Sequence, residues 1–214
     1  MAGSPFPAAP RAASTALALL AVALTSTGTR AQVPGAAAAT PSLDQVRSTL
    51  DKYQDPLVAV REGYLSTLGC IEFPAGLHEG MDHGPTMAYK PGGMGVHFVN
   101  MGLLAPTLDP LKPQVLIYEP VGDRLKLAAA EWFVPVPLAA NGPPSVLGKS
   151  LEGPMEGHEP ILPAELHHYD LHVWLWKNNP NGVFHPTNPD VKCPESPYTH
   201  KDGPPKMVKT GASK

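Results

Sequence analysis

The chain has 214 residues and a formal net charge of −3 at pH 7, with 16 basic and 19 acidic side chains. This length suits one folded domain, and the mild acidity argues against nucleic-acid binding, which needs clustered basic surface. Past the N-terminal leader, no segment is long and apolar enough to be predicted as a membrane span. The partners that remain to be considered are a metal ion, a small ligand or another protein.

Residues 1–31 have the three parts of a signal peptide. Arg11 and the amino terminus are positive, the run from Ala16 to Leu24 is apolar but too short to cross a bilayer, and Ala31 provides a small residue for cleavage. A leader that stays attached is the alternative. The pattern predicts export to a periplasmic or extracellular location.

The rest of the chain is predicted to form a single globular domain over 42–196. A flexible linker, rich in Ala and Pro, precedes it at 32–41, and Lys residues among Pro and Gly predict a disordered basic tail at 197–214. At the start of the domain, Ser42 is typical of a helix N-cap. Four apolar residues follow at helical spacing and predict a helix: Leu43, Val46, Leu50 and Tyr53.

Four later segments have the composition of strands, at 95–100, 114–119, 125–134 and 167–176. The short turn between the second and the third predicts a hairpin. Helices followed by antiparallel strands predict an α+β fold. We therefore expect the N-terminal helical segment to pack on a small antiparallel β-sheet, which can curl like a barrel.

Cys70 and Cys193 are the two cysteines of the chain. In an exported protein two thiols more often pair than stay free. Neither has a second cysteine two to four residues away, so a metal–thiolate site is the weaker interpretation. The sequence predicts a disulfide bond between them.

The segment 167–176 alternates with a period of two, which places His168, Asp170 and His172 on one face of a strand. Two imidazoles and a carboxylate in one row indicate a functional site or a buried polar network. The other strands add to this pattern. Glu119 and Glu131 each share a face with apolar residues of the predicted hairpin, and a buried carboxylate needs a partner or a proton.

A metal site is one interpretation of these side chains, because imidazole and carboxylate bind Zn, Fe, Mn, Ni or Cu. The candidate ligands of a divalent transition metal are His97, Glu119, Glu131 and His172. Supporting or alternative ligands are His168, Asp170 and His83, the last in a Gly-rich loop.

Two alternatives stay open: a non-catalytic ligand-binding protein, and a structural envelope protein whose histidines and carboxylates form a satisfied polar core. The sequence favours no particular enzyme activity, since it has neither a nucleophile elbow nor a phosphate-binding loop. His158 lies between Gly157 and Glu159 and is expected to be a solvated loop residue.

Several segments resemble a group of secreted bacterial proteins of unknown function. The resemblance rests on GMGVHFVN (93–100), LIYEP (116–120), EWFVP (131–135) and HYDLHVWLWKNNPNG (168–182). It covers roughly residues 43–193 and implies an exported protein with a single domain. It assigns neither an activity nor site residues.

Overall fold

The computed structural model describes residues 39–75, 89–159 and 161–209. The expected signal peptide and the candidate ligand His83 lie outside these residues. The described part begins with two short helices, α1 (Leu43–Leu50) and α2 (Pro56–Arg61), joined by the 3₁₀ turn η1 (Asp51–Gln54).

Side chains at the helix ends explain where these helices begin. The Ser42 hydroxyl accepts a hydrogen bond from the backbone N–H of Gln45, whose side chain accepts one from the N–H of Ser42, so α1 starts with a capping box. Asp55 accepts a hydrogen bond from the N–H of Leu57, and Pro56 occupies the first turn of α2. The expected helical segment is confirmed.

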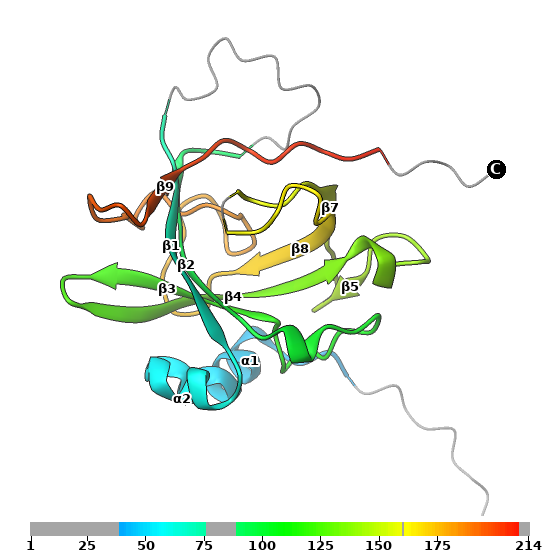
Figure 1. The fold of residues 1–214 in the computed structure, drawn as a ribbon. Coiled ribbons are helices and arrows are strands. Elements are labelled where there is room, and N and C mark those ends of the chain that lie inside the picture. The colour runs from blue at the N-terminus through cyan, green and yellow to red at the C-terminus, as the bar shows by residue number, and fades with distance from the viewer. Residues whose placement is uncertain (1–38, 76–88, 160, 210–214) are drawn as a thin grey trace, which may run out of the picture. The chain divides into compact units, whose positions relative to one another are not determined.

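A seven-stranded sheet forms most of the domain (Figure 1). Its order is β7-β8-β4-β3-β2-β1-β9, and every neighbouring pair is antiparallel except β1 and β9, which are parallel. The strands are β1 (Leu65–Phe73), β2 (Gly92–Val99), β3 (Val115–Val121), β4 (Arg124–Pro135), β7 (Glu152–Met155), β8 (His168–Val173) and β9 (Thr199–Lys201). Smaller elements are η2 (Met101–Leu103), η3 (Val136–Leu138) and the hairpin of β5 (Ser145–Val146) and β6 (Lys149–Ser150).

The structure therefore agrees with an α+β fold and corrects the expected sheet. The sheet is larger than predicted and mixed rather than antiparallel, because β9 joins β1 in parallel. The hairpin of β3 and β4 is present. The sheet curls (Figure 1), and β7 and β9 remain as its two edges.

Each face of the sheet carries a different set of buried side chains. On one face, α1 contributes Val46 and Leu50 to a core that contains Phe98, Tyr118 and Trp132. On the other face, a smaller apolar cluster is formed by residues that alternate with the first set. Figure 1 shows the helices on one side of the sheet and the chain after β9 on the opposite side.

The C-terminal segment is more ordered than expected. The predicted disordered tail, 197–214, contains β9 and continues to a β-bridge between Met207 and Met155, the last residue of β7. Residues 210–214 lie outside the described part. The folded domain thus extends beyond residue 196, and this segment crosses from one edge of the sheet to the other.

Cys70 on β1 and Cys193 form a disulfide bond with a Cα–Cα distance of 5.6 Å, as the sequence predicts. The bond ties the loop before β9 to the strand that β9 pairs with. In the described part of the chain, none of the helices has the length and apolar character needed to cross a bilayer.

Candidate metal centre

Three strands bring His97, Glu131 and His172 together on the face opposite the helices. His97 comes from β2, Glu131 from β4 and His172 from β8. Glu131 and His172 are directly paired in the register of β4 and β8. The alternation of each strand explains why all three share a face, and the curl of the sheet brings His97 across β3 towards them.

The distances between the donor atoms are close to those of a metal site. Glu131 Oε2 lies 3.5 Å from His97 Nε2 and 3.5 Å from His172 Nε2. Ligand atoms about 2.1 Å from a tetrahedral metal are separated by about 3.4 Å. One ligand atom from each of the three residues lies within 4.8 Å of the others.

Burial sets the protonation of this cluster, because the three residues are only 2–7% exposed. It lowers the pKa of His97 to about 3 and that of His172 to about 4. It also raises the pKa of Glu131 well above its usual value, and the charge of Asp170 adds to this effect. The histidines are therefore held neutral, which is the form that binds a metal.

Asp170 lies beside the cluster and between two histidines. Its carboxylate oxygens lie 3.6 Å from His168 Nε2 and 3.9 Å from His172 Nδ1, and His168 Nδ1 contacts the carbonyl oxygen of Leu166 at 3.0 Å. Burial acts to raise the pKa of Asp170, but the interactions with His168 and His172 outweigh it and lower the pKa. A carboxylate behind a ligating imidazole fixes the orientation and tautomer of the ring.

The cluster can hold a metal ion or form a buried polar network, and the hydrogen bonding of its atoms bears on the choice. Glu131 Oε2 and both ring nitrogens of His172 are buried without a hydrogen bond. Leaving such atoms unpaired costs about 1–3 kcal/mol each. A bound cation would supply the partner that these oxygen and nitrogen atoms lack.

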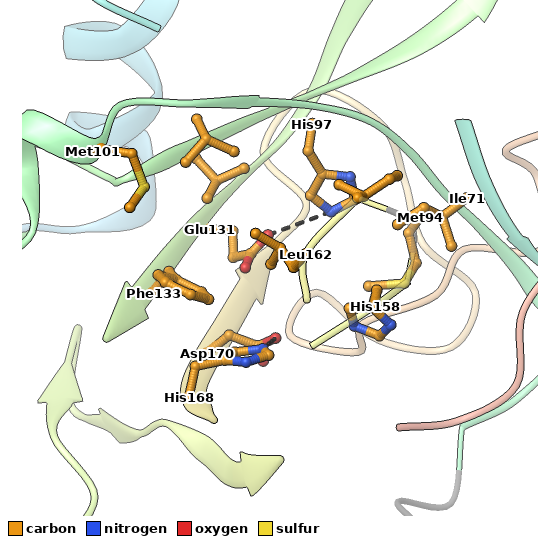
Figure 2. Close-up of a pocket in the computed structure, with 13 residues that line it drawn as sticks. Ile71, Met94, His97, Met101, Glu131, Phe133, His158, Leu162, His168 and Asp170 are labelled. Atoms are coloured by element: carbon orange, nitrogen blue, oxygen red, sulfur yellow. Dashed lines mark ion pairs between the residues drawn. The ribbon is translucent and has the colours of Figure 1, made fainter. Parts of the chain in front are cut away.

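A cavity of about 20 Å³ adjoins the cluster (Figure 2). His97, Glu131 and Asp170 line its polar side, and the remainder is mostly apolar, with Met94 and Phe133 among the lining residues. This volume holds one or two water-sized groups. Met101, which also lines the cavity, is 57% exposed.

Glu119 does not join the other predicted ligands. It forms an ion pair with Lys177 at 2.6 Å. The face of Glu119 was predicted without its position along β3. Val115 is the residue of β3 that pairs with Glu131. Glu119 is four residues farther along the strand, which places its Cα about 13 Å from that of Val115. His168 and Asp170 do adjoin the cluster, as expected of supporting residues.

His158 is a cavity residue that the sequence analysis missed. Instead of being solvated, it is 6% exposed and lines the same cavity as His97 and Glu131. It belongs to an irregular loop, so no periodicity marks it as buried. Its neighbour Asp202 comes from the C-terminal segment that was expected to be a tail.

Comparison of the chain with protein-family models, curated protein sequences and solved structures found no match. The fold and the cluster together define a domain with a curled mixed sheet and a buried group of two histidines and one glutamate.

Proposed function

We propose that this is an exported metal-binding protein whose centre is formed by His97, Glu131 and His172. One observation carries the proposal: three buried donor atoms from three strands lie within 4.8 Å of one another. The lack of hydrogen bonds to Glu131 Oε2 and His172 Nε2 adds support, because each has a lone pair available to a metal.

The donor set favours a divalent transition metal such as Zn, Fe, Mn, Ni or Cu. Imidazole nitrogen suits Zn, Fe, Ni and Cu, and two histidines with one carboxylate also form the ligand set of many iron sites. Three protein ligands leave at least one coordination position for a water molecule or another small ligand. The cavity next to Glu131 and His97 provides space for that ligand.

A metal held by these residues with an open position would supply Lewis-acid chemistry, which lowers the pKa of a bound water or polarises a bound ligand. His97 and His172 would hold the metal through neutral nitrogens, and the Asp170 carboxylate, 3.9 Å from His172 Nδ1, would favour the tautomer with the proton on that nitrogen. The centre is thus suited to binding a small molecule from the cavity side.

Export of the protein is supported by two features. Residues 1–31 have the pattern of a signal peptide, and the bond between Cys70 and Cys193 is of the kind that persists in oxidising compartments. These features support a periplasmic or extracellular location.

Elemental analysis tests the metal proposal directly. The mature protein should be purified from its native compartment without an affinity tag or chelator, beside the variants His97→Ala, His172→Ala and Glu119→Gln. We expect close to one transition metal per wild-type chain, loss of the metal in both histidine variants, and retention in Glu119→Gln, which removes a carboxylate outside the cluster.

The contrary result is also clear. Folded wild-type protein that is metal-free and takes up none of Zn, Fe, Mn, Ni or Cu would reject the metal centre. The cluster would then be a buried polar network that stabilises the sheet.

A further inference from the structure

His158 faces the cavity of the proposed metal centre from outside the sheet. Its side chain lines the cavity together with His97 and Glu131 (Figure 2). Although the residue is 6% exposed, neither ring nitrogen has a hydrogen bond. A neutral imidazole has one donor and one acceptor, and neither makes a hydrogen bond in His158.

The loop around His158 holds the ring in place. The N–H groups of Ile161 and Leu162 both donate to the His158 carbonyl oxygen at 2.8 Å. The ring packs edge-on against Phe73, and its Nδ1 lies 3.5 Å from Asp202 Oδ2. Asp202 is itself fixed beside β1, because its N–H donates to the Glu72 carbonyl oxygen.

This arrangement directs Nδ1 of the His158 ring at the Asp202 carboxylate and leaves Nε2 buried without a hydrogen bond. With the proton on Nδ1, facing Asp202, the Nε2 atom is a free acceptor; with the proton on Nε2, that atom is a free donor. The ring centroid of His158 lies 6.3 Å from that of His168, whose Nε2 is 3.6 Å from the Asp170 carboxylate beside the cluster.

We propose that His158 hydrogen-bonds the non-protein ligand at the open position of the metal, and that this ligand is a water, a hydroxide or a small monoanion. The inference rests on the proposed function of His97, Glu131 and His172. A divalent metal bound by the Glu131 carboxylate would carry a charge of +1 at its open position, and the Asp170 carboxylate beside His172 would reduce that charge without occupying the position. The cavity volume of about 20 Å³ limits the ligand to a few atoms.

His158 is assigned this role rather than that of a fourth metal ligand. In the described part of the chain, the group of donors within 4.8 Å of one another is His97, Glu131 and His172, and His158 is outside it. It therefore reaches the metal through the bound ligand and positions that ligand.

Azide binding to cobalt-loaded protein tests this role, because Co²⁺ reports its coordination through visible absorption and azide is a small monoanion. Wild type is compared with His158→Phe, which keeps a ring without nitrogens, and with His158→Gln, which keeps a donor and an acceptor. His167→Phe is the matched control, since His167 is outside the residues that line the cavity. Cobalt content is measured separately in every sample.

We expect all four proteins to hold about one cobalt ion. The Kd of azide should rise about ten- to a hundredfold in His158→Phe, as expected when a hydrogen bond to a charged group is lost. It should rise less in His158→Gln and remain unchanged in His167→Phe. If His158→Phe does not fold, a Kd for His158→Gln between two- and tenfold above wild type supports the role.

Unchanged azide affinity in the folded His158 variants, or no azide binding to cobalt-loaded wild type, would overturn the role of His158 and leave the metal centre intact. Loss of cobalt from folded His158→Phe and His158→Gln would also overturn it, since His158 would then be a ligand. Wild type that binds no cobalt or any other transition metal would instead reject the metal centre itself.

Discussion

The substitution Glu131→Gln should make the metal-free protein more sensitive to acid. His97 and His172 are kept neutral by burial, with pKa values of about 3 and about 4, whereas an unfolded histidine has a pKa of about 6.5. As the pH falls below 6.5, the unfolded chain binds protons that these folded residues do not bind, and the folded state loses stability. In wild type, Glu131 opposes this trend.

The opposition comes from the raised pKa of Glu131. Burial keeps its carboxyl protonated in the folded state, while an unfolded glutamic acid ionises above about pH 4.5. The contribution of Glu131 to stability is therefore complete below pH 4.5 and is lost as the pH rises through the folded pKa. Between pH 7.5 and 5.5 the carboxyl and the two imidazoles act in opposite directions.

The size of the effect follows from the histidine values. Lowering the pH from 7.5 to 5.5 costs about 1.4 kcal/mol for each histidine, or about 3 kcal/mol for the pair, because neither is protonated in the folded state at pH 5.5. Glu131→Gln should show this loss in full. Wild type should show a smaller one, since its carboxyl offsets part of the loss.

Urea unfolding in the presence of a chelator, at pH 7.5 and 5.5, measures both free energies. Other ionisable groups are common to the two proteins and cancel in the comparison, and Glu119→Gln serves as a control that removes a carboxylate elsewhere. Equal pH dependence in wild type and Glu131→Gln would refute the claim that Glu131 is held protonated between the two histidines.

Three further predictions concern the metal, its surroundings and the disulfide. A metal at a thousand times its Kd should stabilise wild type by about 4 kcal/mol. For a domain of this size the Tm should rise by about 8–16 °C, measured by scanning fluorimetry. An equal rise in Glu131→Gln would count against the metal centre. Asp170→Asn should keep the metal but bind it about 10–100-fold more weakly, as measured by chelator competition, and unchanged affinity would show that Asp170 does not support His172. Replacing Cys70 and Cys193 by serine should cost about 2–5 kcal/mol, because the bond closes a separation of 123 residues; a midpoint of urea unfolding equal to that of wild type would contradict this.

Much of the candidate site was predictable from strand alternation. The period of two placed His97, Glu131 and His172 on the faces that they occupy, since a strand that alternates regularly has only two faces to offer. The same reasoning chose Glu119, which has the right face but lies at the wrong end of β3. Alternation says nothing of position along a neighbouring strand, which depends on register.

The parts that escaped prediction depend on contacts between distant segments. β9 has three residues, and its parallel pairing with β1 is not marked by any local pattern. Hydrogen bonds such as that from Cys70 N–H to the Tyr198 carbonyl oxygen hold this segment in place. His158 lies beside Asp202 of this C-terminal segment. The sequence around His158 therefore does not predict its burial, just as the sequence around β9 does not predict its pairing.

The distribution of unpaired atoms is a further argument for a bound ligand. In the described residues, the buried side-chain nitrogen and oxygen atoms that lack a hydrogen bond belong to five residues: His97, Glu131, His158, Asp170 and His172. Four of them line one cavity, and the fifth, His172, contacts Glu131. Imperfect packing would scatter such atoms through the core, where buried polar groups are nearly always paired. Their concentration around one cavity is expected where a metal and a small ligand complete the hydrogen bonding and coordination of the site.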